Sequence, residues 1–353
     1  MKALVKYSPG KYNMEIRDVP EPSPGPGQVK VAVHAAGICG SDLHIYYDKI
    51  GIPMRYPVVV GHEFAGTIVA LGKNVTHINV GEHVVSETTF SSCGQCWWCK
   101  QGSDQLCKDR HVIGYWENGV FAPYVVVPAR RIHKLPASVN LDNAPLIEPI
   151  AGCYHCVIEV TGIVVNNWVL VTGPGPIGLT SALIAKSAGA RVIVIGTGED
   201  EQRLKISHDL GIDRTINLAK GDPAKSVQEL VGPDGVDVFL ECSGAEEAVG
   251  MGVNLLRRQG KYTQIGLFKD KIALDMDPII FKEIKIYGGY AHKWSSWEKA
   301  IELYATKNGK WDKLISEVVS LSEWKSAFEK LKQKKALKIM LKPVGNEVGN
   351  IYN

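Results

Sequence analysis

The chain has 353 residues, more than a single hydrophobic core usually serves, so we expect two domains. Its apolar fraction of 45% and charged fraction of 22% are ordinary for a soluble globular protein, and no apolar run approaches the roughly 20 residues that cross a bilayer. The net charge of +3 is not concentrated in one basic block, which argues against nucleic-acid or membrane binding.

Short β-like runs separated by Pro and Gly clusters fill the first part of the chain. One run, Val29–Val33, follows a segment rich in Pro and Gly at residues 22–27. This pattern predicts a mostly antiparallel, loop-rich β domain. Residues 1–7 have no long apolar stretch and no small-residue cleavage site after them, so we expect no secretory signal and a cytoplasmic location.

Three short segments of this part carry residues that suit a mixed metal site. The segments are 37–44, 61–63 and 148–149, which contain Cys39, His62, Glu63 and Glu148. Cys, His and a carboxylate can hold a catalytic zinc ion with one exchangeable position, where the metal would acidify a bound alcohol. Taken singly, each residue is weak evidence, because a lone histidine is more often a core or surface residue. Spacing alone therefore leaves this site open.

Four of the eight cysteines lie close together, at Cys93, Cys96, Cys99 and Cys107. Without a secretory signal, zinc thiolates are more plausible than disulfides. Four thiolates can close a tetrahedron around zinc, with Zn–S distances of about 2.3 Å and no position left for chemistry. The alternative, four reduced core cysteines, fits poorly because the residues between them are mostly polar or Gly. The spacing predicts a structural zinc site.

From residue 166 onward, apolar strands alternate with helical stretches. We predict strands at 168–172, 192–195, 236–241, 260–265 and 284–287, and helices at 177–188 and 201–210. Alternation of this kind indicates parallel strands joined by right-handed crossovers, a doubly wound sheet that ends near residue 290. The last sixty or so residues return to a mixture of helix and strand.

The first of these strands runs directly into a glycine-rich loop that contains Gly173, Gly175 and Gly178, and a helix follows. A G-x-G-x-x-G sequence between strand and helix is typical of dinucleotide binding. The first glycine permits a tight turn, the second lets the backbone approach a pyrophosphate, and the third lets the helix pack on the strand. The alternative is a glycine-rich turn without a ligand.

At the end of the second strand, Gly196 stands where an NAD-binding site usually has an Asp or Glu for the ribose. Its absence removes repulsion against a 2′-phosphate, to which Thr197 and Arg203 could donate hydrogen bonds. The acidic residues 199–201 argue the other way. Both NADP and NAD remain open, with NADP slightly favoured.

Taken together, these segments resemble the medium-chain zinc alcohol dehydrogenases, and within them the polyol (sorbitol-type) and threonine dehydrogenase branch. The matching segments occur in the family's order at 1–3, 37–44, 61–63, 93–107, 121–124, 148–149 and 173–178. The resemblance implies a GroES-like catalytic β domain at 1–153, a Rossmann domain at 154–290, and a return to the catalytic domain at 291–353. It also implies an active site between the domains and a homo-oligomer, dimer or tetramer.

The resemblance also implies roles for individual residues. Cys39, His62 and Glu63 match zinc ligands, and Glu148 matches a further carboxylate that binds the metal or its water. Ser41 and His44 match a proton relay, in which a hydroxyl passes a proton to an imidazole that titrates near neutrality. The alternative for His44 is a surface histidine in a turn. Further residues match positions that line the nicotinamide half of the cofactor: Ile177, Ile265, Gly266, Leu267, Gly289, Tyr290 and Ala291.

The substrate is less determined than the reaction, which converts a secondary alcohol to a ketone. Tyr46, Tyr47 and Trp116 could surround a polyhydroxylated chain, although a threonine-type amino alcohol is an alternative. We interpret Trp97 and Trp98 as core or subunit contacts. Two other classes are a non-catalytic zinc- and nucleotide-binding protein, which would need a broken metal set, and a zinc-free quinone reductase, which normally lacks both metal sets.

Overall fold

The computed structural model describes residues 1–268, 270–306 and 310–343. These residues form two compact units. The first unit contains Met1–Glu148, Lys293–Ala305 and the described residues from Ile315 onward. The second unit contains Pro149–His292 and Thr306–Leu314, so far as they are described. Each unit has its own hydrophobic core.

The first unit is built on a seven-stranded sheet within the described residues, in the order β10-β6-β5-β3-β18-β17, with β9 also paired to β3. Its strands are β3 (Gln28–Gly37), β5 (Glu63–Leu71), β6 (His83–Ser86), β9 (Tyr124–Pro128), β10 (Ile132–Lys134), β17 (Ile315–Ser320) and β18 (Lys338–Lys342). All pairs are antiparallel except β17 with β18. The predicted antiparallel, loop-rich β domain is confirmed.

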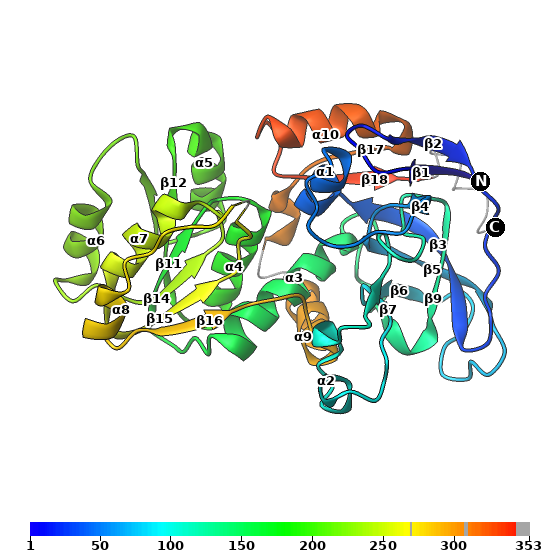
Figure 1. Cartoon of the computed structure of the whole chain (residues 1–353), viewed down its shortest axis with the longest axis horizontal. Coiled ribbons are helices and arrows are strands. Elements are labelled where there is room, and N and C mark those ends of the chain that lie inside the picture. Colours follow the sequence, from blue (N-terminus) through cyan, green and yellow to red (C-terminus); the bar gives the residue numbers. More distant parts are fainter. Residues whose placement is uncertain (269, 307–309, 344–353) are drawn as a thin grey trace. The chain divides into compact units, whose positions relative to one another are not determined.

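Smaller elements complete this unit. A three-stranded sheet joins β1 (Lys2–Lys6), β2 (Met14–Asp18) and β4 (Val58–Val59), and β7 (Thr89–Ser91) pairs with β8 (His111–Val112). The helices are α1 (Gly40–Tyr46), α2 (Trp97–Lys100), α9 (Trp294–Ala305) and α10 (Trp324–Lys332). Helix α10 buries Trp324, Ala327 and Phe328, which are three and four residues apart on one helical face. Figure 1 shows α10 lying along β17 and β18.

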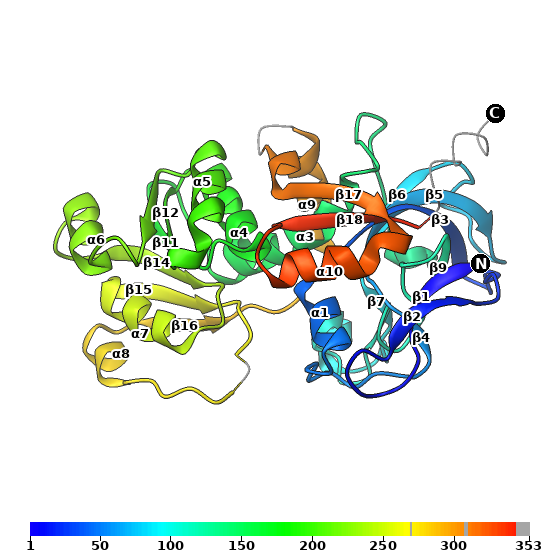
Figure 2. The ribbon, with the colours of Figure 1, turned by 90° about the horizontal axis from the view of Figure 1, so that it is seen from above.

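The second unit is a parallel sheet of six described strands in the order β13-β12-β11-β14-β15-β16. The strands are β11 (Trp168–Thr172), β12 (Arg191–Gly196), β13 (Arg214–Asn217), β14 (Val236–Glu241), β15 (Leu256–Gln264) and β16 (Lys285–Gly288). The helices are α3 (Ile147–Tyr154), which begins in the first unit, α4 (Pro176–Ser187), α5 (Glu201–Asp209), α6 (Pro223–Val231), α7 (Glu246–Leu255) and α8 (Asp277–Phe281). Figure 2 shows α4 and α5 on one face of the sheet and α7 on the other.

The predicted doubly wound parallel sheet is confirmed, and each predicted strand and helix of this region is present within a few residues of its expected bounds. Strand β13 was not predicted, because only Ile216 of its four residues is buried and no apolar run marks it. The strand order reverses between β11 and β14, and sheets of this type usually bind ligands at the carboxyl ends of the strands beside such a reversal. No helix in the described part of the chain is long and apolar enough to span a membrane.

Candidate metal centres and nucleotide loop

The first metal centre is assembled where β3 ends. Gly37, the last residue of β3, pairs with Glu63 of β5 on one side and with Met340 of β18 on the other. Cys39 lies two residues after the end of β3, and His62 immediately precedes β5. Strand pairing therefore brings Cys39, His62 and Glu63 together, with one ligand atom from each within 4.8 Å of the others. A Cβ atom on Gly37 would lie 2.2 Å from Glu63 Oε2, so only glycine leaves room for this carboxylate.

The surroundings of His62 favour positive charge. Burial lowers the pKa of His62, but hydrogen bonding to Cys39 and the charges of Asp42 and Glu148 outweigh it and raise the pKa to about 10. Asp42 is fully buried, and its Oδ2 accepts a hydrogen bond from the Cys39 N–H at 2.8 Å. Its Oδ1 lies 3.9 Å from His62 Nδ1 and can orient the imidazole. The negative groups around His62 would be neutralised by a divalent cation. A set of Cys, His and carboxylate donors therefore fits zinc.

A buried lysine that sequence reasoning missed completes this centre. Lys338 Nζ forms an ion pair with Glu63 Oε2 and donates a hydrogen bond to the carbonyl oxygen of Ile38 at 2.9 Å. Burial lowers the pKa of Lys338, but Glu63 and Cys39 raise it above its usual value overall. Lys338 therefore neutralises part of the negative charge of the donor set. Its sequence context, a lysine beginning an apolar strand, carries no signal of this role.

The other predicted residues of this centre lie around the three donors. Glu148, in the first turn of α3, is not within the 4.8 Å set, but its charge contributes to the raised pKa of His62. Ser41 and His44 lie three residues apart on α1 and so share a helical face. The Ser41 Oγ atom is buried. Burial raises the pKa of Tyr115, and a side-chain hydrogen bond with Ser41 opposes this rise. A hydroxyl at this place can exchange a proton with a bound ligand.

The aromatic surroundings differ from the prediction. Tyr46 packs edge-on against Trp324 and Phe328 of α10, and the Tyr47 hydroxyl donates to Glu329 at 3.0 Å, so both are engaged in packing α1 on α10.

Trp116 stacks on His111 with ring centroids 5.0 Å apart. The tyrosine ring beside the metal centre is that of Tyr115, which is buried with its centroid 5.8 Å from that of His62. Burial and the nearby Asp42 and Cys39 raise the pKa of Tyr115, so its hydroxyl stays protonated and available as a donor.

The second metal centre is the four-cysteine set in the first unit. One sulfur from each of Cys93, Cys96, Cys99 and Cys107 lies within 4.8 Å of the others. The Cys99 sulfur lies 3.5 Å from that of Cys96 and 3.9 Å from that of Cys93. A zinc tetrahedron with Zn–S bonds of about 2.3 Å has S–S edges of about 3.8 Å. The sulfur positions therefore fit one zinc ion whose four coordination positions are all filled by cysteine.

Backbone N–H groups favour the thiolate form of one of these cysteines. The N–H groups of Gln95 and Cys96 donate toward Cys93 and lower the pKa of its thiol to about 7. Burial and the neighbouring thiols raise the pKa of Cys99 to about 12. A single cation would allow all four groups to be thiolates together.

The nucleotide loop lies in the second unit, between β11 and α4. Gly173 follows β11 with a φ of +85°, and a Cβ atom on Gly178 would lie 1.9 Å from the Gly173 carbonyl oxygen. Gly175 is the N-cap of α4 and has no atom within 4 Å of where a Cβ atom would be. The loop therefore packs closely at its first and third glycines and leaves open space at the second. Open backbone before the N-terminus of α4, a twelve-residue helix, fits a phosphate.

The end of β12 carries the residues considered for the 2′ position. Thr197 donates to Asp200 Oδ2 through its N–H at 3.0 Å and its hydroxyl at 2.8 Å. Arg203 Nη1 lies 3.9 Å from Asp200 Oδ1, and Asp200 is buried. Asp200 is therefore held by its own neighbours, and Arg203 lies close to the end of the strand that follows the glycine loop.

The remaining cofactor positions follow neighbouring strands. Ile265–Leu267 come directly after β15, and Gly289–Ala291 come directly after β16, which pairs in parallel with β15. The Gly289 N–H donates to the carbonyl oxygen of Gln264 at 2.9 Å. The structure therefore brings both segments to the carboxyl edge of the sheet, as it does the glycine loop.

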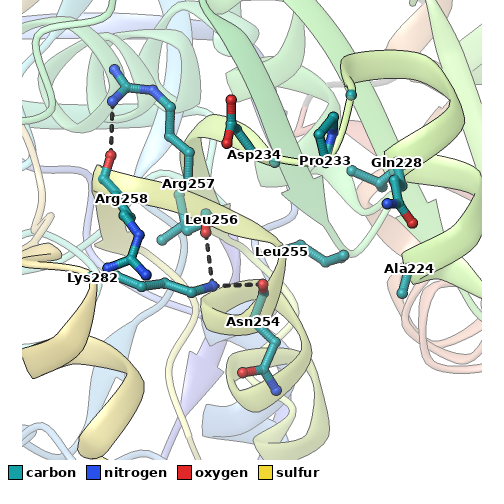
Figure 3. Close-up of a pocket in the computed structure, with 13 residues that line it drawn as sticks. Ala224, Gln228, Pro233, Asp234, Asn254, Leu255, Leu256, Arg257, Arg258 and Lys282 are labelled. Carbon is teal, nitrogen blue, oxygen red and sulfur yellow. Dashed lines mark hydrogen bonds between the residues drawn. The ribbon is translucent and has the colours of Figure 1, made fainter.

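A separate cavity of about 560 Å³ lies in the second unit beside the start of β15. Figure 3 shows the hydrogen bonds that two of its cationic side chains, Lys282 and Arg257, make to backbone oxygens. Lys282 Nζ donates to the carbonyl oxygens of Asn254 and Leu256 at 2.7 and 2.9 Å, and Arg257 donates to the Arg258 carbonyl oxygen at 2.8 Å. The Lys282 side chain thus satisfies backbone carbonyl oxygens at the end of α7, and we assign no binding site to this cavity.

Comparison with known proteins adds to this geometry. Residues 25–137 match the family of alcohol dehydrogenase GroES-like domains, and residues 176–306 match the family of zinc-binding dehydrogenases. The chain is 43% identical to a sorbitol dehydrogenase from Halalkalibacterium halodurans over 98% of this chain and 100% of that protein. It is 35% identical to an L-threonine 3-dehydrogenase from Pyrococcus horikoshii over 96% and 98% of the two chains.

The fold of this chain is also similar to that of experimentally solved protein structures. A Sinorhizobium meliloti protein solved with bound NADP superimposes with a TM-score of 0.90 at 30% identity, over 97% of this chain and 99% of that chain.

Proposed function

Because this chain belongs to the zinc-binding alcohol dehydrogenase family, we propose that it oxidises a secondary alcohol of a polyol to the ketone, with NAD(P) as hydride acceptor. Family membership confirms the predicted GroES-like and Rossmann architecture and the expectation of an enzyme. The observation that carries the substrate chemistry is the set of Cys39, His62 and Glu63, with one ligand atom from each within 4.8 Å. Three protein ligands leave a fourth tetrahedral position for a substrate oxygen.

In the proposed mechanism the residues of the first unit hold the alcohol and move its proton. Cys39, His62 and Glu63 would hold zinc, and Asp42 would keep the His62 ring in orientation. Bound zinc would supply the positive charge that acidifies the alcohol, and a bound nicotinamide would serve as the acceptor of its hydride. The Ser41 hydroxyl takes the alcohol proton, and His44 passes it to solvent.

Two further groups tune this site in the proposal. Glu148 adds a carboxylate near the metal, and Lys338 limits the negative charge on Glu63.

A polyol is favoured as substrate by the 43% identity with a sorbitol dehydrogenase over nearly the whole chain. The buried Tyr115 hydroxyl beside His62 offers a donor to a second hydroxyl group of such a substrate. The second candidate is an amino alcohol of the threonine type, favoured by the 35% identity with a threonine dehydrogenase. These substrates differ in charge and hydrogen bonding beside the reacting carbon, so one assay separates them.

For the cofactor we propose a preference for NADP over NAD. Gly196 presents no carboxylate at the end of β12, and the nearby Asp200 is 6% exposed and accepts both hydrogen bonds of Thr197. Arg203 can then pair with a 2′-phosphate.

We also propose a cytoplasmic homo-oligomer, dimer or tetramer. The four-cysteine set that suits zinc thiolates fits a reducing compartment. Trp97 and Trp98 are exposed, which excludes the core and suits subunit contacts. Ile280, Phe281 and Ile286 are exposed near β16, an edge strand of the second unit's sheet. Size-exclusion chromatography with light scattering would test the oligomer, and a monomer at micromolar concentration would contradict it.

The decisive experiment measures kcat/KM for a panel of polyols, sugar alcohols and amino alcohols with both cofactors. We expect the highest value for a polyol with NADP; a threonine-type substrate with the highest value would establish the second candidate, and a large preference for NAD would overturn the cofactor proposal. Cys39→Ala should abolish turnover and bind one zinc ion fewer per chain, with the fold retained. Full turnover in zinc-free protein would refute the proposed chemistry.

A further inference from the structure

Glu241 is a fully buried carboxylate at the end of β14, beside the point where the strand order reverses. Its Oε1 accepts hydrogen bonds from the Ser243 N–H at 2.7 Å, from the Ser243 hydroxyl, and from the Thr172 hydroxyl at 3.2 Å. Its Oε2 accepts from the Gly244 N–H at 3.0 Å and from Gln264 Nε2 at 2.7 Å. Every one of these donors is uncharged.

The charge of Glu241 therefore has no cationic partner in residues 1–268, 270–306 and 310–343. Both oxygens accept from N–H groups, which suits the ionised, acceptor-only form. An isolated buried charge is costly, and structural carboxylates usually avoid it by pairing. Asp237, near the other end of the same strand, does so with Arg257 at 2.7 Å. Glu241 thus departs from the pattern of a merely structural acid.

Glu241 also ties together three loops at the carboxyl edge of the sheet. Thr172 directly precedes the glycine loop, Ser243 belongs to the loop after β14, and Gln264 directly precedes Ile265–Leu267. The Glu241 carbonyl oxygen accepts from the N–H groups of residues 265 and 266 at 2.9 and 2.8 Å. A Cβ atom on Gly266 would lie 2.8 Å from Glu241 Oε2, so the third loop packs directly on the carboxylate.

We propose that Glu241 is a positioning residue for the nicotinamide half of the cofactor, and that its buried negative charge favours the oxidised cofactor over the reduced one. The inference rests on the dinucleotide site of the proposed function. The oxidised nicotinamide ring carries a positive charge and the reduced ring carries none. An anion held against residues 265–267, the segment that the resemblance assigns to the nicotinamide half, would therefore stabilise the oxidised complex selectively, whereas loop positioning would help both forms equally.

The test compares Glu241→Gln with a matched control on the same strand, Asp237→Asn. Isothermal titration calorimetry gives Kd for NADP⁺ and NADPH, and for NAD⁺ and NADH. In Glu241→Gln we expect the Kd of the oxidised cofactor, divided by the Kd of the reduced cofactor, to rise by about tenfold. This change is equivalent to about 1.4 kcal/mol. Asp237→Asn should leave this ratio unchanged. The wild-type ratio in a folded Glu241→Gln protein would overturn the inference.

Circular dichroism and Tm establish whether each variant folds, because an amide at position 241 would face the N–H donors of Gly244 and Gln264. Thr172→Val and Ser243→Ala provide a second route, since each removes an uncharged donor and keeps the carboxylate. Both should weaken binding of the two redox forms by the same factor; unchanged affinity in both would overturn the positioning role. Absence of dinucleotide binding by the wild type would instead overturn the proposed function.

Discussion

Replacing Lys338 with Met removes a buried positive charge while keeping most of the side-chain volume. The side chains of Lys338 and Glu63 are 3% and 1% exposed, so water cannot screen the carboxylate that is left behind. Removing one partner of a buried ion pair costs about 3–5 kcal/mol. The Ile38 carbonyl oxygen also loses its donor at 2.9 Å. We therefore expect zinc-free Lys338→Met to lose about 4 kcal/mol of unfolding free energy, or about 8–16 °C in Tm.

The assay is urea unfolding of chelator-treated protein, with Lys342→Met as the matched control. Lys342 lies on the same strand and pairs with Asp142 at 2.8 Å, but the two side chains are 29% and 34% exposed. A partly exposed pair of this kind contributes about 0–1 kcal/mol. Saturating zinc should restore part of the stability of Lys338→Met, because the ion supplies positive charge beside Glu63.

Equal losses in the two lysine variants would refute the reasoning. A double variant, Glu63→Gln with Lys338→Met, separates charge from packing. It should recover most of the loss of Lys338→Met, because no buried charge remains unpaired. A loss equal to the sum of the two single variants would mean that Lys338 acts through packing alone.

Three further outcomes follow from the geometry. Cys99→Ala should lower Tm in calorimetry, with activity surviving in the folded fraction; an unchanged Tm would contradict a structural metal. Gly178→Ala would place a Cβ atom 1.9 Å from the Gly173 carbonyl oxygen, so it should abolish dinucleotide binding in calorimetric titration while zinc content stays normal. Burial opposes ionisation of Asp213, but hydrogen bonds from Lys186 and a backbone N–H hold the pKa of Asp213 below its usual value. A depressed folded-state pKa contributes stability above the unfolded value of about 3.9 that is lost as pH falls through the folded value. The Tm deficit of Asp213→Asn at pH 7 should therefore shrink in acid, and a deficit independent of pH would refute this.

The parts of the sites that are contiguous in sequence could be predicted from it. The glycine loop at 173–178 and the cysteines at 93–107 each place their functional atoms within a few residues, so local chain geometry brings them together. The catalytic set is different. Cys39 meets His62 and Glu63 only through the pairing of β3 with β5, which no local spacing encodes, and the family resemblance was needed to connect them.

Groups recruited by long-range packing could not be predicted. Lys338 reads as an ordinary lysine at the start of an apolar strand, and its role depends on contact with Ile38, 300 residues away. Tyr46 and Tyr47 are nearer to Cys39 in sequence than Tyr115 is. They nevertheless contact α10, through Trp324 and Glu329, and Tyr115 is the tyrosine beside the metal centre. The role of Glu241, the last residue of its strand, also leaves no local signal, because its uncharged donors come from the ends of two other strands and from the loop that follows its own strand.

Strand β18 lies between β3 and β17 in the first unit's sheet, and Lys338 at its start is 300 residues from Ile38 in the sequence. Until β18 is in place, the end of β3 at residues 36 and 37 lacks its partner strand on that side, and the carboxylate of Glu63 lacks the ammonium group of Lys338. The second unit, by contrast, draws nearly all of its strands from one continuous segment. The sheet of the second unit can therefore close from one stretch of chain, whereas the metal pocket of the first unit has its full complement of charge only after segments far apart in the sequence have paired.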